Sequence, residues 1–187
     1  MKGSDGRISG VHLRSLLQME YLRKEAFMPD ILLTRIDNRL VHGQVGVAWT
    51  SSLAGCNLIV VADDLVAQDE VQQSLMRATA QNAGCGIRFF TIEKTCAVIH
   101  KASPSQHIFL VVRNPQAARA LVEGGVPIDR LCIGNMHVAP GKVVSNESHV
   151  YVDEKDLEDL RFIRDRGTDV YIQIAPGDRR LDFEPGK

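Results

Sequence analysis

Short apolar runs alternate with longer amphipathic stretches along the chain from residue 30 onward. The runs are rich in Val, Ile and Leu and contain few polar positions, which is typical of strands buried on both faces of a sheet. In the stretches between them, apolar residues recur at helical spacing. The pattern predicts strands over residues 31–35, 57–62, 87–91, 107–112, 130–133, 148–152 and 170–174, and helices over residues 44–52, 68–81 and 92–101.

Two further helices carry clear end signals. Asn114 is suited to cap the first of them, Pro115 follows at its first position, and two glycines lie beyond its end at 124–125. Asp153 is suited to cap a charged amphipathic helix that stops at Gly167. Strands that are mostly followed by helices predict one doubly wound α/β domain, with a mostly parallel sheet of about seven strands covered by helices on both faces. Such domains bind ligands where loops leave the carboxyl ends of strands.

Residues 1–27 differ from the rest of the chain. The first ten are polar and rich in Gly and Ser, and residues 11–27 have the spacing of a short helix without the uninterrupted apolar centre of a secretory signal. The first predicted strand follows directly after Met28 and Pro29. We therefore expect residues 1–27 to be an N-terminal extension or an expression scar outside the fold, and residues 28–187 to form a single domain.

Composition narrows the class of protein. The chain has 187 residues, and its 22 Lys and Arg residues balance 23 Asp and Glu residues, a net charge of -1. This balance argues against a nucleic-acid partner, because phosphate backbones demand a basic surplus. The 44% hydrophobic and 24% charged residues indicate a globular chain. No apolar run approaches the ~20 residues that span a bilayer, so we expect a soluble protein.

Cysteine and histidine spacing indicates neither a disulfide framework nor a metal site. The four cysteines form no C-x-x-C pair and lie in or beside apolar stretches, so we expect free thiols. The six histidines include no H-x-H or H-E-x-x-H pattern. The glycine-rich motifs of nucleotide-binding loops are also missing from the sequence. We therefore expect no metal and no cofactor.

Chemically active side chains are concentrated in the loop after the first predicted strand. His42 offers an imidazole nitrogen that is neutral, and therefore nucleophilic, near neutral pH. Arg39 is suited to hold the oxygens of a phosphoryl group, and Asp37 to accept the other imidazole N–H and fix the tautomer. The alternative is that these side chains only stabilise the loop. The candidate residues here are Arg35, Asp37, Asn38, Arg39, His42, Gly43, which opens the next helix, and Gln44.

Other strand ends add weaker candidates. Asp63 and Asp64 end the second strand and are suited either to orient the loop histidine or to form an aspartyl-phosphate receiver or Mg²⁺ site. A receiver would need another carboxylate at a strand end, but the fourth strand ends in Arg113, which suits a phosphate instead. After the fifth strand, Lys142 is a candidate to steer a phosphoryl group. His137 there is either a partner contact or a surface side chain.

The run RIDNRLVHGQVGVAW resembles the active-site loop of the IIB components of the mannose-type (mannose/fructose/sorbose) sugar phosphotransferase system. That loop typically reads R-I-D-D-R-L-I-H-G-Q-V, with a tryptophan soon after. The resemblance continues through VADD, VEGG, GNMH-x-x-x-GK and VDEKDLEDLRFI, and it covers Met28 to about Gly177. Asn38 departs from the family pattern, in which a second aspartate is usual, so a catalytic carboxylate at that position is in doubt.

The resemblance implies a phosphoryl carrier. In this family the histidine that His42 matches accepts a phosphoryl group on its δ1 nitrogen from a phosphohistidine on the IIA protein or domain. It then passes that group to a sugar carried through the membrane by the IIC and IID subunits, with no metal or nucleotide. The segments RIDNRLVHGQVGV, GIRFFTIEKT, NMH and DLRFI most resemble the branch specific for N-acetylgalactosamine or galactosamine.

The same resemblance implies a cytoplasmic protein that associates with the inner face of the membrane through IIC and IID. The competing interpretation is a non-enzymatic α/β regulatory domain that binds a phosphorylated ligand or partner. The oligomeric state stays open, with a homo-oligomer among the alternatives.

Overall fold

The computed structural model describes residues 28–183, so the predicted extension over residues 1–27 and the last four residues of the predicted domain lie outside the described residues. The main sheet has seven strands in the order β3-β2-β4-β1-β5-β8-β9, and neighbouring strands are parallel except for β8 and β9. The doubly wound, mostly parallel α/β fold predicted from the sequence is confirmed. The strands are β1 (Asp30–Asp37), β2 (Leu58–Ala62), β3 (Gly86–Phe90), β4 (His107–Val112), β5 (Arg130–Asn135), β8 (Asp169–Ile172) and β9 (Leu181–Asp182).

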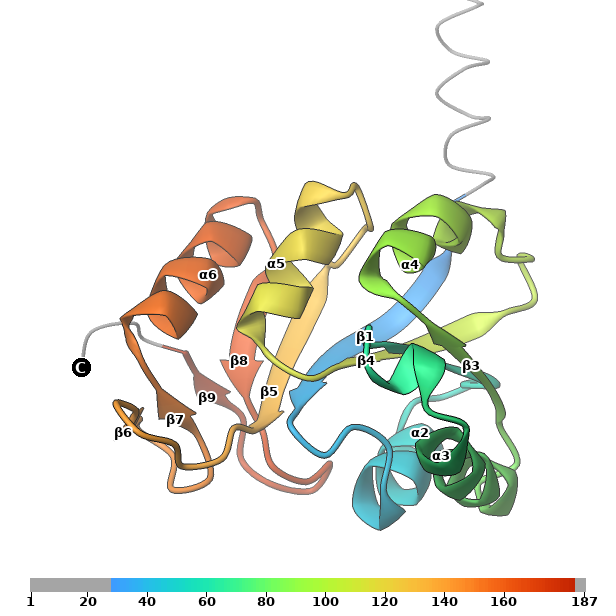
Figure 1. Ribbon diagram of the computed structural model, residues 1–187, viewed down its shortest axis with the longest axis horizontal. Coiled ribbons are helices and arrows are strands. Elements are labelled where there is room, and N and C mark those ends of the chain that lie inside the picture. The colour runs from blue at the N-terminus through green and yellow to red at the C-terminus, as the bar shows by residue number, and fades with distance from the viewer. Residues whose placement is uncertain (1–27, 184–187) are drawn as a thin grey trace, which may run out of the picture.

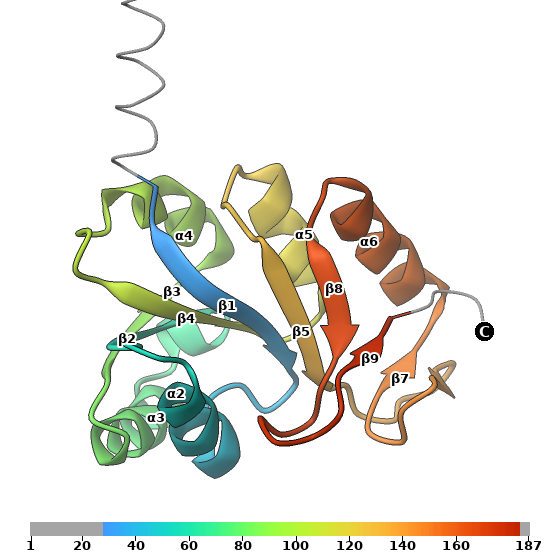
Figure 2. The same ribbon diagram turned by 180° about the vertical axis from the view of Figure 1, so that it is seen from behind.

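Helices cover both faces of this sheet. Three helices, α4, α5 and α6, lie side by side over one face (Figure 1), and the view from behind has β1, β5 and β8 in front of them (Figure 2). No helix within residues 28–183 is long and apolar enough to cross a membrane. The helical segments are η1 (Gln44–Trp49), α2 (Thr50–Ser52), η2 (Val66–Gln68), α3 (Glu70–Asn82), α4 (Ile92–Val98), η3 (Ile99–Lys101), α5 (Pro115–Glu123) and α6 (Glu154–Asp165).

Two apolar clusters, one on each face, explain the near-continuous apolar strands. The first packs side chains such as Leu110 against Leu121 of α5 and Leu160 of α6. The second packs Val111 with Met76 of α3. Because alternate residues of one strand point to opposite faces, β4 needs apolar residues at every position, and all its residues after His107 are buried.

The helix ends follow the signals in the sequence. The Asn114 side chain accepts a hydrogen bond of 2.9 Å from the Ala117 N–H at the start of α5. Asp153 and Asp156 form a reciprocal capping box at the start of α6. The predicted helix over residues 44–52 divides into a π-helical segment, η1, and the short α2. A Cβ on Gly46 would lie 2.3 Å from Thr79 Cγ2, so this glycine lets η1 approach α3 closely.

One predicted strand is mostly wrong, and two short observed strands were not predicted. Within residues 148–152 only β7 (Tyr151–Val152) is a strand, and it pairs with β6 (Val143–Val144) in a separate two-stranded sheet. Both sides of β5 are already occupied by β1 and β8, so this segment reaches β5 only beyond its end, through a bridge between Val150 and Met136. The seventh strand of the main sheet is β9, whose two residues are too few to produce a recognisable alternation.

Candidate active site

The carboxyl ends of β4, β1 and β5 lie at the edge of the sheet where this fold binds ligands. The connections that follow β1 and β4, which are neighbours in the sheet, leave toward opposite faces, η1 on one and α5 on the other. Asn38, just after β1, joins the loops of all three strands. Its backbone N–H donates to the Asn135 carbonyl (3.0 Å), its side-chain oxygen accepts from the His137 N–H, and its Nδ2 lies 3.4 Å from the Arg113 carbonyl.

The amide at position 38 suits this junction. An amide side chain both accepts from His137 and donates toward the Arg113 carbonyl, whereas an ionised aspartate would only accept. Asn38 therefore supports the loop, and it is not positioned as a replacement for a catalytic carboxylate.

The loop after β1 turns sharply and is held by its own backbone. The Asp37 carbonyl accepts from the Leu40 N–H at 2.9 Å, and Asp37 Oδ1 accepts from the Arg39 N–H at 3.1 Å. Leu40 has a φ of 57°, a left-handed conformation that is unfavourable for a residue with a branched side chain. Its side chain is fully buried, so packing holds the strained turn that presents the residues on either side of it.

His42 faces Asp37 with one ring nitrogen. Its Nε2 lies 3.4 Å from Asp37 Oδ1, is buried, and has no closer partner among residues 28–183. Because a carboxylate only accepts, the tautomer that suits this contact carries its proton on Nε2 and its lone pair on Nδ1. The His42 side chain is 24% exposed, and since Nε2 is shielded, Nδ1 is the nitrogen open to a reaction partner.

Asp37 is an ionised carboxylate inside the protein. Burial by itself would raise its pKa, but the contact with His42 and the charge of Arg35 together bring the pKa below the ordinary value. Arg35 Nη2 lies 3.3 Å from Asp37 Oδ2, and both side chains are almost completely buried. Asp37 thus has one oxygen toward a permanent cation and one toward the imidazole.

The two arginines of this segment occupy different environments. Arg35 is 2% exposed, so its guanidinium is buried. Of the two roles predicted for Arg35, phosphate binding and loop support, this position fits loop support. The Arg39 side chain is 52% exposed, and its Nε lies 3.8 Å from Asp37 Oδ1. Arg39 is therefore the arginine at the surface, and it faces the same Asp37 oxygen as His42.

Three of the other candidates hold the surrounding loops together, namely Asp63, Asp64 and Arg113. Arg113 binds Asp63 through Nε (2.6 Å) and Nη2 (3.1 Å), and its Nη1 donates to the Asn38 carbonyl (3.1 Å). Burial by itself would raise the pKa of Asp63, but the hydrogen bonds and charge of Arg113, together with hydrogen bonds from the Val66 and Leu65 N–H groups, bring the pKa below its ordinary value. Asp64 accepts from the Ile92 N–H at 2.8 Å. The predicted contact of Asp63 or Asp64 with His42 is wrong, since Asp37 occupies that position.

The remaining candidates have different surroundings. Lys142 is paired with Asp156, and it lies 3.4 Å from Asp153, at the start of α6. The His137 ring is exposed, and its Nε2 lies 2.8 Å from Asn135 Nδ2, beside the Asn38 junction. Gly43 is exposed and immediately precedes η1, which begins at Gln44. Through Asn38, which contacts Asn135 and His137, the loop after β5 adjoins the loop after β1.

Sequence reasoning missed Gly134 on β5. A Cβ at this position would lie 1.8 Å from Arg35 Cζ, so only glycine leaves room for the buried guanidinium. A glycine inside a strand often marks such a close approach, and that was the available signal.

Comparison with known proteins agrees with this geometry. The family model described as the PTS system sorbose subfamily IIB component matches residues 31–185. The chain therefore belongs to this family of IIB components, the phosphotransferases that carry a phosphoryl group in sugar phosphotransferase systems. The family and the class of activity predicted from the sequence are both confirmed.

The individual relatives are similar over most of their length. The N-acetylgalactosamine-specific phosphotransferase enzyme IIB component 1 of Escherichia coli K12 is 60% identical over 152 residues, which cover 81% of this chain and 95% of that protein. Its crystal structure has a TM-score of 0.79 and covers 82% of this chain and 99% of its own. An N-acetylgalactosamine IIB component from Streptococcus pyogenes is 40% identical, with a TM-score of 0.76 and coverages of 82% and 95%.

Removing the charge of Asp37 should destabilise the fold in a pH-dependent way. Asp37→Asn leaves the buried Arg35 cation unpaired, and we expect the free energy of unfolding to fall by about 3 kcal/mol at pH 7. Since the pKa of Asp37 is lowered on folding, its stabilisation is complete above the ordinary aspartate pKa of about 3.9 and is lost as the pH falls through the lower folded-state value. The difference from wild type should therefore shrink in acid.

Urea unfolding at pH 7 and pH 3 measures this difference. Asp165→Asn, at an exposed carboxylate on α6, is the matched control and should unfold like the wild type at pH 7. A difference between Asp37→Asn and wild type that stays constant over this range would contradict the ionised state assigned to Asp37.

Proposed function

We propose that His42 is the residue that carries the phosphoryl group, and that the group is held on Nδ1. The observation that supports this assignment is the burial of Nε2 against Asp37, which leaves the Nδ1 lone pair at the surface. In transfer, the Nδ1 lone pair forms a bond to phosphorus while the bond from phosphorus to the donor imidazole breaks. The electrons of that broken bond return to the donor nitrogen, and the proton on Nε2 of His42 stays in place.

Asp37 contributes electrostatically to this step. As Nδ1 bonds to phosphorus, the imidazole ring gains positive charge, and an ionised carboxylate 3.4 Å from Nε2 stabilises that charge. The reverse change occurs when the phosphoryl group leaves for the acceptor. A carrier has to load and unload, and a carboxylate that stays charged without taking the proton suits both directions.

Arg39 is proposed to bind the oxygens of the phosphoryl group in transit. Its guanidinium is half exposed and faces the same Asp37 oxygen as the imidazole, and no hydrogen bond to the guanidinium is found within residues 28–183. A planar guanidinium donates two parallel N–H groups to a phosphoryl group, which suits the trigonal arrangement of oxygens during transfer. Arg113 and Lys142 already bind carboxylates, so we assign them to the framework.

His42→Ala should abolish phosphorylation while leaving the protein folded. The side chain is partly exposed and lies in a loop outside the helices and strands, so the expected change in stability is small. The assay is intact-mass and peptide mass spectrometry after incubation with phosphoenolpyruvate, the general phosphotransferase proteins and a cognate IIA protein. The expected adduct lies on the peptide that contains His42 and is lost in mild acid.

His100→Ala is the matched control, because His100 is an exposed histidine in η3, far from the carboxyl ends of the strands. It should be phosphorylated like the wild type. A normal phosphoryl adduct on His42→Ala would remove His42 from the reaction. An unmodified wild type beside a phosphorylated IIA would favour a regulatory domain that only binds phosphorylated partners.

Arg39→Lys should slow loading without preventing it. A lysine keeps the charge but loses the paired N–H donors, and a hydrogen bond to a charged group is worth about 1.5–3 kcal/mol, so the expected single-turnover rate is about tenfold to a hundredfold lower. Rapid-quench measurement of phosphoryl transfer from phosphorylated IIA tests this. Arg88→Lys, on the exposed face of β3, should leave the rate unchanged, and an unchanged rate in Arg39→Lys would exclude Arg39 from the transfer step.

N-acetylgalactosamine is the sugar we propose for the complete system. The support is the 60% and 43% identity to two Escherichia coli IIB components named as N-acetylgalactosamine-specific, against 34% for the mannose-specific EIIAB component. By the same reasoning the partners are a IIA donor and membrane subunits IIC and IID, and the protein works at the cytoplasmic face of the membrane.

The sugar assignment predicts a clear preference in transport chemistry. Membrane vesicles that contain the cognate IIC and IID, supplied with the phosphorylated protein, should phosphorylate N-acetylgalactosamine at least about tenfold faster than mannose. The two sugars differ in the substituent and configuration at C2 and in the configuration at C4, and a single missing substituent already gives about that discrimination. Equal rates, or a preference for mannose, would overturn the assignment of the sugar and leave the carrier role of His42 intact.

A further inference from the structure

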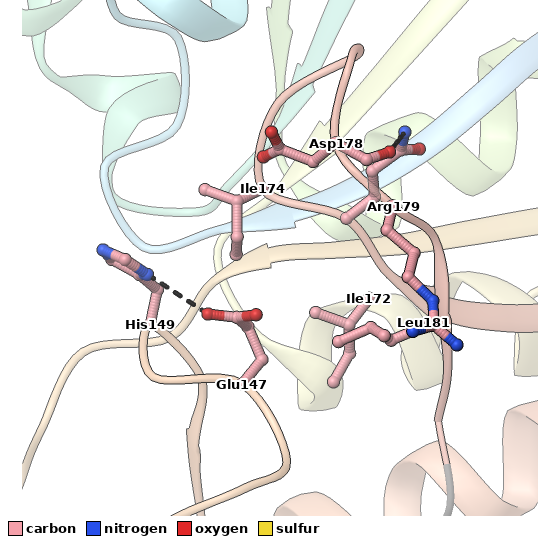
Figure 3. A pocket seen from close by; sticks show the side chains of 8 residues that line it. Glu147, His149, Ile172, Ile174, Asp178, Arg179 and Leu181 are labelled. Carbon is pink, nitrogen blue, oxygen red and sulfur yellow. Dashed lines mark hydrogen bonds and ion pairs between the residues drawn. The ribbon is translucent and has the colours of Figure 1, made fainter.

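Arg35 is a buried cation that donates hydrogen bonds to two backbone carbonyls just after β8. Its Nη1 donates to the Gln173 carbonyl at 2.9 Å, and its Nη2 donates to the Ile174 carbonyl at 3.0 Å. Both carbonyls belong to the turn between β8 and β9, two strands away from β1. This turn lies at the same carboxyl edge of the sheet, and it also lines the hollow drawn in Figure 3. The guanidinium therefore links β1 to the turn after β8.

The space for this guanidinium is made by the neighbouring strand. On β5, Gly134 has no side chain, and any Cβ there would overlap the guanidinium. Cys132 Sγ lies 3.3 Å from Nη1, and the ring of Trp49 lies beneath the guanidinium with its centroid 4.7 Å from Cζ. Arg35 is thus confined on every side and has little freedom to choose another rotamer.

A cation confined in this way imposes an orientation on its carboxylate. Arg35 Nη2 contacts Asp37 Oδ2, which leaves Oδ1 directed toward His42 Nε2 and the Arg39 N–H. Arg35, Arg39 and His42 are the titratable groups that contact the Asp37 carboxylate within residues 28–183. Of these, Arg35 alone is both buried and held by groups outside the loop.

We propose that Arg35, seated against Gly134, is a positioning residue for His42. It fixes the Asp37 carboxylate so that Nε2 of His42 stays protonated and shielded and Nδ1 stays at the surface. This inference rests on the proposed function of His42 and deepens it. The turn between β8 and β9 thereby takes part in phosphoryl transfer, although none of its residues contacts the imidazole in the structure described.

The proposal is tested first on the unphosphorylated protein. Long-range ¹H–¹⁵N spectra of ¹⁵N-labelled histidine report which ring nitrogen carries the proton, and solvent exchange reports how well that proton is shielded. In the wild type we expect a protonated Nε2 in slow exchange. In Arg35→Met and in Gly134→Ala we expect that Nε2–H to exchange at least about a hundredfold faster, because a displacement of about 1 Å is enough to break such a contact.

The single-turnover rate of phosphorylation by IIA should fall in the same variants, by about a hundredfold. Arg35→Lys keeps the charge next to Asp37 but cannot bind both carbonyls, so it should recover part of both the shielding and the rate. It also provides a folded variant if Arg35→Met fails to fold, and Gly134→Ala displaces the guanidinium without removing it.

The matched control is Arg119→Met. Arg119 also links two elements, from α5 to Glu158 (3.0 Å) and Asp159 (2.8 Å) of α6, but on the opposite face of the sheet. It should lower stability and leave both His42 measurements unchanged.

Three results would overturn the proposal. In the first, the folded Arg35 and Gly134 variants keep the wild-type Nε2–H exchange. In the second, they lose rate while that exchange is unchanged. In the third, Arg119→Met disturbs His42 equally. Failure of the wild type to become phosphorylated would overturn the proposed function instead, and the exchange measurement would still test the contact between Arg35, Asp37 and His42.

Discussion

The candidate site depends on the buried ion pair between Arg35 and Asp37. Burying either charge alone would be costly, so each residue requires the other, and the backbone carbonyls of the turn after β8 accept hydrogen bonds from Nη1 and Nη2 of the guanidinium. Because the pair is buried and its position is fixed, Asp37 presents one oxygen to a surface loop in a constant direction. The orientation of His42 follows from that oxygen.

The order of the strands turns this local arrangement into a site. Placing β1 between β4 and β5 brings three loops together, and Asn38 hydrogen-bonds to the loops of both neighbours. Most of the charged groups at this edge neutralise one another, as Arg113 and Asp63 do. Among the described residues, the loop after β1 keeps one imidazole nitrogen and the guanidinium of Arg39 at the surface, which suits a protein that receives a phosphoryl group from one partner and passes it to another.

Much of this structure could be predicted from residues close together in the sequence. The contacts that were missed join residues on different strands, far apart in the sequence. The strands, the caps at Asn114 and Asp153, and the active loop follow from residues close together in the chain. Alternation along β1 also places Arg35 and Asp37 on one face. The neighbour of Arg35 in space depends on register, which pattern alone does not supply, so the role of Gly134 was hidden. For the same reason Asp63 was a candidate to orient the histidine, although its partner is Arg113.

The central claim is that Asp37 holds Nε2 of His42 and leaves Nδ1 to react. The most direct test is NMR of the ¹⁵N-labelled protein after phosphorylation by IIA, in which the coupling between ³¹P and ¹⁵N identifies the nitrogen that bears the phosphoryl group. The account predicts coupling to Nδ1 of His42, with the proton retained on Nε2. Coupling to Nε2, or a phosphoryl group on another residue, would contradict it.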